Sequence, residues 1–134
     1  MKIKLSSPPE LGSPFAPYSQ IADVSASRIV FIAGQVATDR AGNVVGIDDF
    51  DAHCQQVFAN IEIALDAAGL GWENVAQFTS YLVSENDIDA FRRYRERVFP
   101  QMFPSGRYPT NTLLIVKRLV TDALRLEVQA TAAG

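Results

Sequence analysis

The stretch DDFDAHCQQVFANIEIALDAAGLGWENVAQFTSYLV (residues 48–83) predicts one complete helix followed by a strand. Asp48 or Asp49 can cap the N-terminus of this helix, and Gly69 can end it, because side-chain oxygens and glycine satisfy the free backbone groups at helix ends. The apolar residues recur at helical spacing and make one stripe, formed by Cys54, Val57, Phe58, Ile61, Leu65 and Ala68. Residues 75–83 are rich in β-branched and aromatic residues, which is typical of a strand.

A second helix is predicted on the C-terminal side of this stretch. Residues 84–87 (Ser-Glu-Asn-Asp) resemble a capping box in which Asp replaces Glu. The helix that follows has a buried stripe made of Ile88, Phe91, Tyr94 or Arg95, and Val98. Pro100 and Pro104 lie near the expected end of the helix, since proline interrupts helical hydrogen bonding.

Further strands are expected on both sides of the helices, over residues 20–24, 28–34 and 112–117, in the alternating segment 124–129, and over residues 2–5 if these also pair. The proline-rich residues 6–17 predict an extended lead-in. The resulting order, β-β-β-α-β-α-β-β, indicates an α+β fold with helices on one face of a sheet. The other face is then either solvated or covered by a second subunit, and the apolar strand over residues 112–117 favours a subunit.

Length and composition exclude several classes of protein. The chain has 134 residues, 48% of them hydrophobic and 20% charged, which predicts a single domain over residues 1–134. A net charge of -3 makes nucleic acid an unlikely partner, because nucleic-acid binding needs a basic surface. One cysteine forms no internal disulfide, and neither a signal peptide nor a membrane-spanning segment is expected. We therefore expect a cytoplasmic protein without a membrane partner.

Few residues suggest chemistry on their own. His53 is the only histidine, so no metal site of histidines and cysteines is expected, and its helical neighbour Cys54 points about 100° away from it. The arginines of residues 92–97 make either a solvated helix face or a contact for phosphate or nucleic acid. Glu127 is either an exposed strand residue or, if it lines a pocket, a carboxylate that can orient a water or take a proton.

Four segments match motifs that occur together in one protein family. Residues 16–20 (Ala-Pro-Tyr-Ser-Gln) resemble its G-P-Y-S-Q segment, and residues 31–35 resemble its strand ending in S-G-Q. Residues 60–83 follow its N-x-x-x-x-L-x-A-A-G and T-x-Y-L pattern, and residues 126–130 resemble its terminal V-E-I-E-A. In this order the four segments identify a resemblance to the RidA (YjgF) family, also called endoribonuclease L-PSP-like, over about residues 14–130.

The resemblance implies a fold and an activity. The family's fold is similar to that of bacillary chorismate mutase, a mixed sheet with two helices on one face. Three copies join their sheets into a barrel-like core, with small-molecule pockets at the subunit interfaces. The best-known members hydrolyse enamines and imines derived from amino acids to a keto acid and ammonia, and they need no cofactor or metal. In those members an arginine grips the substrate carboxylate, a glutamate positions a water, and a tyrosine and a serine line the pocket.

The family's tyrosine and glutamate fall on Tyr18 and Glu127, which are therefore the expected catalytic residues. Other family positions differ, and the expected substrate-binding set is Asn111 in place of the arginine, Ala33 in place of the serine, the adjacent Gly34, Phe91 in place of an asparagine, Leu113 and Arg107. Asn111 offers only neutral hydrogen bonds, which is a deficit of about 1–2 kcal/mol, or roughly tenfold in affinity. Arg107 and Arg118 are candidate sources of a compensating charge, and for Arg118 a structural role is the expectation.

Three hypotheses follow for the function. The chain is an enamine or imine hydrolase with altered substrate specificity, in which Glu127 holds the attacking water, Tyr18 closes the pocket and Asn111 contacts the substrate. Alternatively, it is a non-catalytic metabolite-binding or regulatory trimer, because a shared fold does not guarantee a shared activity. An RNA-acting role has the least support, since only older family names and the arginines of residues 92–97 suggest it.

Overall fold

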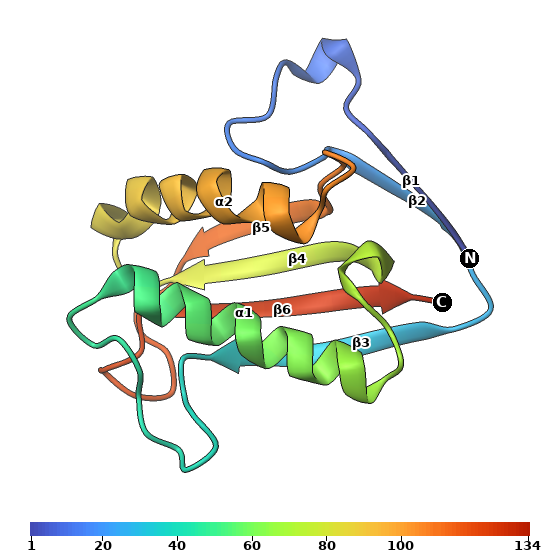
Figure 1. Ribbon diagram of the computed structural model, residues 1–134. Coiled ribbons are helices and arrows are strands. Elements are labelled where there is room, and N and C mark those ends of the chain that lie inside the picture. The colour runs from blue at the N-terminus through green and yellow to red at the C-terminus, as the bar shows by residue number, and fades with distance from the viewer.

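The computed structural model describes all residues, 1–134, and its centre is a four-stranded sheet (Figure 1). Its strands are β3 (Ile29–Val36), β4 (Val75–Leu82), β5 (Thr110–Ile115) and β6 (Leu126–Ala133), in the spatial order β3-β6-β4-β5. β6 runs antiparallel to β3 and β4, whereas β4 and β5 are parallel. The sheet is therefore mixed, and β3 and β5 are its edges.

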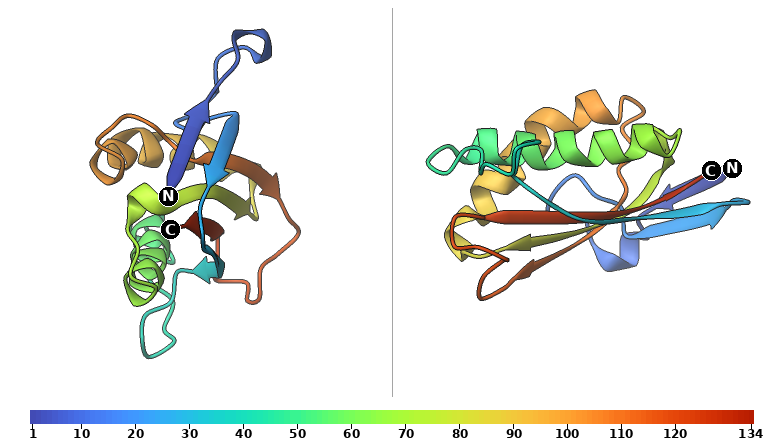
Figure 2. Two further views of the ribbon diagram at one scale, coloured as in Figure 1. Left: turned by 90° about the vertical axis from the view of Figure 1, so that its right-hand side faces the viewer. Right: turned by 90° about the horizontal axis from the view of Figure 1, so that it is seen from below.

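The two long helices, α1 (Phe50–Ala67) and α2 (Ile88–Met102), lie on the same side of this sheet (Figure 2). This arrangement confirms the predicted α+β fold with two helices on one face. Asp49 is the N-cap of α1, since its Oδ1 accepts a hydrogen bond from the Ala52 amide at 3.1 Å. Ser84 caps only the short 3-10 turn η3 (Glu85–Asp87), so the predicted capping box lies one turn before α2. None of the helices has the length and apolar character that crossing a membrane requires.

The N-terminal strands form a separate sheet. β1 (Lys2–Ser6) pairs antiparallel with β2 (Ile21–Ser25), and neither strand joins the four-stranded sheet. The segment between them, predicted to be extended, contains one 3-10 turn, η1 (Pro9–Leu11), because proline is tolerated in the first turn of a helix. Its end is fixed against the start of β5, since Ser19 donates from Oγ to the Tyr108 carbonyl at 2.6 Å and from its amide to the Pro109 carbonyl at 3.1 Å.

The core lies between the helices and the sheet and is largely aromatic. Phe58 of α1 packs edge-on against Phe78 of β4 and Phe99 of α2, with ring centroids 5.9 and 5.5 Å apart. Such pairs add to the free energy gained by burial alone. A third short turn, η2 (Trp72–Asn74), brings Trp72 against this cluster.

The face of the sheet away from the helices carries a different set of side chains. Strand alternation places on it Phe31, Gln77, Thr79, Tyr81, Thr112, Leu114, Glu127, Gln129 and Thr131. We call this the open face. Phe31 on it is 80% exposed, which is unusual for a large apolar side chain in a strand.

Candidate active site

A cavity of about 320 Å³ lies between the N-terminal segment, α2 and β5, and we call it the α2/β5 cavity. Its lining consists of Phe15, Ala16, Tyr18, Ile88, Arg92, Arg95, Asn111 and Leu113. Three of these, Tyr18, Asn111 and Leu113, are site residues expected from the sequence. They come from segments far apart in the chain, so this part of the expected site is brought together by the fold.

Arg95 is the most buried charged residue of this lining, with 3% of its surface exposed. Its guanidinium carbon lies 4.2 Å from the centroid of the Phe91 ring, and Nε donates to the Phe91 carbonyl at 3.4 Å. None of the five ion pairs of the structure includes Arg95. Burial lowers the pKa of Arg95 to about 10, so the side chain still carries its charge at neutral pH.

Asn111 lies on β5 opposite Phe78 of β4. Ser80 donates from Oγ to Asn111 Oδ1 at 2.8 Å, and Ser80 is almost fully buried. This bond orients the amide and leaves its Nδ2 hydrogens without an acceptor in the protein. Tyr18 and Asn111 also line a second cavity, of about 580 Å³, whose lining includes residues of β2. The two residues therefore stand at the boundary between two adjoining cavities.

Glu127, Gly34 and Ala33 form a second group, away from the α2/β5 cavity. Glu127 lies opposite Val36 of β3 and Tyr81 of β4, and its side chain covers Gly34. A Cβ added to Gly34 would come within 2.7 Å of Glu127 Cδ. Ala33 and Gly34 belong to a β-bulge, where the register of β3 shifts between Ile32 and Gln35. Within one chain, the predicted catalytic residues Tyr18 and Glu127 thus lie in separate places.

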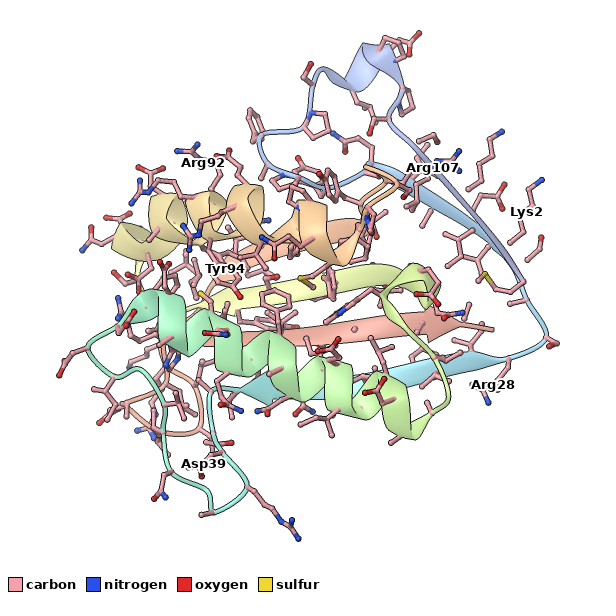
Figure 3. The ribbon with its side chains drawn as sticks, viewed as in Figure 1. Lys2, Arg28, Asp39, Arg92, Tyr94 and Arg107 are labelled. Atoms are coloured by element: carbon pink, nitrogen blue, oxygen red, sulfur yellow. The ribbon has the colours of Figure 1, made fainter.

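Three further residues named from the sequence, Phe91, Arg107 and Arg118, also lie outside the lining of the cavity. Phe91 is fully buried in the core, so it contributes to the cavity only as the surface on which Arg95 rests. Arg107 lies beyond the C-terminal end of α2, whereas Arg92 lies near the start of this helix (Figure 3). The Arg107 side chain is exposed and lines a different groove, together with Ile3 and Leu5 of β1. Arg118 donates to carbonyl groups of its own loop, at Leu119 and Val120. Within one chain, neither arginine lines the α2/β5 cavity.

Arg95 is not among the site residues expected from the sequence, although the sequence carries a signal for it. Arg95 follows Phe91 by four residues, which places both on the inner face of α2. The helical spacing predicted Tyr94 or Arg95 as part of the buried stripe, and both are buried, but we also grouped Arg95 with arginines that have other surroundings. Arg92 pairs with Asp89 and Glu96, each at 3.3 Å, and Arg97 pairs with Asp51 at 2.9 Å. The arginines of α2 thus do not form one basic face.

His53 holds two loops together inside the protein. It is fully buried, its Nδ1 donates to the Val45 carbonyl at 2.9 Å, and its Nε2 accepts from the Arg125 amide at 3.0 Å. Both ring nitrogens are occupied, and burial lowers the pKa of His53, so the ring is neutral and structural. No group of three or more histidine, cysteine, aspartate or glutamate side chains is placed to hold a metal ion.

Comparison with known proteins supports the family resemblance that the four sequence motifs indicated. The model of the family described as Endoribonuclease L-PSP matches residues 10–134. A RutC family protein of Synechocystis sp. is 30% identical over 133 residues, which are 98% of this chain and 97% of that protein. A RutC family protein of Pyrococcus horikoshii is 34% identical over 119 residues, 89% of this chain and 88% of that protein.

Two further similarities bear on structure and activity. The crystal structure of YyfB from Yersinia pestis, a protein of unknown function of the conserved Rid family, has a TM-score of 0.85, 28% identity and 99% coverage of both chains. A 2-iminobutanoate/2-iminopropanoate deaminase of Capra hircus is 29% identical over 119 residues, 88% of this chain and 85% of that protein. On the family match, the relatives and the shared fold, this chain belongs to the endoribonuclease L-PSP family, the RidA (YjgF) family that its motifs indicated.

Proposed function

We propose that this protein hydrolyses enamine or imine intermediates to a keto compound and ammonia, with a substrate specificity that differs from that of the best-known members. The observation that carries the proposal is the convergence of Tyr18, Asn111 and Leu113 with a charged Arg95 on one small cavity. A cavity of about 320 Å³ is at the small end of the range for ligand sites, which suits an intermediate derived from one amino acid. The relative that is named an iminobutanoate deaminase supports the same reaction class.

The complete site requires a second copy of the chain in this proposal. Glu127 does not line the α2/β5 cavity of its own chain. β5 is an edge strand, and the open face exposes Phe31 and Leu114. Burying these side chains against another copy would remove apolar surface from water. We therefore propose a homotrimer in which three sheets form a barrel-like core and Glu127 of one copy faces the cavity of the next.

The proposed reaction needs one water and one proton-transfer group. The Glu127 carboxylate takes one proton of the water as the water oxygen attacks the carbon of the C=N bond, and passes it to the nitrogen, which gives a neutral carbinolamine. Glu127 then moves the carbinolamine hydroxyl proton to the nitrogen, the C=O bond forms, the C–N bond breaks, and ammonia leaves. Asn111 Nδ2 donates to a polar group of the substrate, and Tyr18 closes the cavity. An enamine first takes a proton on carbon and loses one from nitrogen, and the resulting imine enters the same sequence.

A coupled assay tests this function. An amino-acid oxidase generates a panel of imines in the presence of semicarbazide, which traps the imine that has not been hydrolysed. We expect the wild-type protein to accelerate keto-acid formation and Glu127→Ala to lose at least about 100-fold of that rate, as is typical of removing a general base. The matched control is Glu73→Ala, which removes an exposed carboxylate outside the site and should keep the wild-type rate. Equal rates for wild type and Glu127→Ala would refute the mechanism.

A second candidate function is a non-catalytic, metabolite-binding trimer. Asn111 and Ala33 favour it, because both stand where the family has residues that line the catalytic pocket. In that case no imine is hydrolysed, while a small ligand still raises the melting temperature of the protein. An RNA-acting role gains no support, since two of the four α2 arginines are ion-paired and one is buried.

A further inference from the structure

We propose that Arg95 binds the carboxylate of a small ligand with an apolar side chain in the α2/β5 cavity. This inference rests on the proposed function of the cavity and names its substrate class. In this proposal the arginine that binds the anion lies on the inner face of α2, because on β5 Asn111 stands in place of the family arginine. Arg95 is buried and has no ion-pair partner, and most of the residues that line the cavity with it are apolar.

The first step is the uncompensated charge. A buried charge is costly unless an opposite charge or several hydrogen bonds compensate it. The partly buried Arg125 has such a partner, since its Nη2 lies 2.7 Å from Asp87 Oδ1. Arg95 is more deeply buried, at 3% exposure, and no carboxylate of the chain lies within ion-pair distance. An anionic ligand would supply the missing charge.

The second step is the direction of the free donors. Arginine has five N–H groups, and only Nε of Arg95 has an acceptor in the protein, the Phe91 carbonyl. No fully buried side-chain nitrogen lacks a partner, so the terminal nitrogens of Arg95, which have no acceptor in the protein, are not fully enclosed, and Arg95 lines the α2/β5 cavity. The Phe91 ring, 4.2 Å from the guanidinium carbon, holds the planar group in place. A held guanidinium presents two parallel donors, which match a carboxylate.

The third step is the rest of the lining. Asn111 adds an amide donor whose orientation the Ser80 hydroxyl fixes. Phe15, Ala16, Ile88 and Leu113 are apolar, so the part of the ligand beyond its carboxylate should be apolar too. Arg92 also lines the cavity, but Asp89 and Glu96 already neutralise its charge. Arg95 is therefore the arginine that is available to an anion.

The same geometry gives a reason for the neutral residue on β5. Asn111 and Arg95 line one cavity of about 320 Å³, so an arginine at position 111 would bring a second positive charge close to the first. Two like charges at short distance in a partly buried site repel each other strongly. The family arginine and Arg95 are thus alternatives for one role. We infer that the site keeps one positive charge, and that this charge contacts the ligand from α2 instead of from β5.

Isothermal titration with 4-methyl-2-oxopentanoate, a keto acid with an apolar side chain, tests the proposal. The uncharged ketone 4-methyl-2-pentanone is the parallel probe. We expect Arg95→Met to bind the keto acid about 10- to 100-fold more weakly than wild type, the range for loss of charge-assisted hydrogen bonds. Its affinity for the ketone should stay within about threefold of wild type, because the apolar lining is intact. Arg93→Met is the matched control, because it removes an exposed arginine of α2 outside the cavity, and it should bind the keto acid as wild type does.

Unchanged keto-acid affinity in folded Arg95→Met would overturn the proposal, and so would the absence of keto-acid binding by wild type at millimolar concentration. If Arg95→Met does not fold, Arg95→Lys carries the test. It keeps the charge but loses the bidentate geometry, so about tenfold weaker binding is expected and wild-type affinity contradicts the proposal.

Imine hydrolysis by the same variants separates this inference from the proposed function. Keto-acid binding that depends on Arg95, without any hydrolysis, would support the binding site and refute the enzyme. Hydrolysis with the same KM in wild type and Arg95→Met would support the enzyme and refute the role of Arg95. If the protein hydrolyses imines and Arg95 binds the substrate carboxylate, KM should rise about 10- to 100-fold in Arg95→Met while kcat changes less, because the guanidinium binds substrate and transition state alike.

Discussion

Gly34→Ala should abolish the proposed hydrolysis without unfolding the protein, because the Glu127 side chain occupies the space that a Cβ would need. The added carbon would lie 2.7 Å from Glu127 Cδ and 2.9 Å from Cγ, and closer still to Oε2. Ordinary contacts between such atoms are about 3.5–4.0 Å. The carboxylate must therefore move by about 1 Å or more, and a shift of 1 Å in a catalytic group can cost about 100-fold in rate.

The fold should tolerate this change. Gly34 has no positive φ, so alanine causes no backbone strain there. The atoms in the way belong to the end of a flexible side chain. Glycine to alanine also lowers the entropy of the unfolded chain, which stabilises by about 0.4–1 kcal/mol at compatible positions. We expect the free energy of unfolding to stay within about 1 kcal/mol of wild type.

The assay is kcat for imine hydrolysis, with urea denaturation and sedimentation velocity to verify folding and assembly. Gly71→Ala is a matched control, because a Cβ there would likewise meet a glutamate side chain, with Glu73 Oε2 at 2.6 Å, but outside the proposed site. We expect kcat to fall about 100-fold in Gly34→Ala and to stay within twofold in Gly71→Ala. A folded, assembled Gly34→Ala protein with wild-type kcat would show that the position of Glu127 is irrelevant to the reaction.

Further predictions concern assembly and stability. Sedimentation should show a trimer, and Phe31→Lys, which places a charge on the open face, should dissociate it; a wild-type monomer at micromolar concentration would contradict the proposed assembly. Burial lowers the pKa of His53 below 6.5, so the unfolded state binds more protons in this window, and the melting temperature should fall as pH drops below about 6.5, less steeply in a His53→Gln variant. Asp87→Asn should lower the free energy of unfolding in urea by about 2–3 kcal/mol, because it leaves Arg125 without its partner at 2.7 Å; a loss below about 0.5 kcal/mol would refute this. The Cys54 thiol is fully buried and its pKa is raised, so Ellman's reagent should label it only after unfolding.

Local sequence patterns were sufficient for the elements and the family. The apolar stripe of residues 54–68 predicted α1, and alternation in residues 124–129 predicted the strand β6, because side-chain periods of 3.6 and 2 are properties of the backbone itself. Four short motifs predicted the family that the comparisons confirm. Element ends were less accurate, since β5 begins at Thr110, two residues before its predicted start.

Tertiary structure decided which residues share a site. Periodicity places Arg95 on the inner face of α2, but it does not say that β5 leaves a cavity there or that no carboxylate approaches. Arg107 follows α2 closely in sequence and yet lines another groove, while Tyr18 and Asn111 are 93 positions apart and line the same cavity. A sequence determines each element through local backbone geometry, whereas the distance between side chains on different elements depends on how those elements pack, which no single segment encodes.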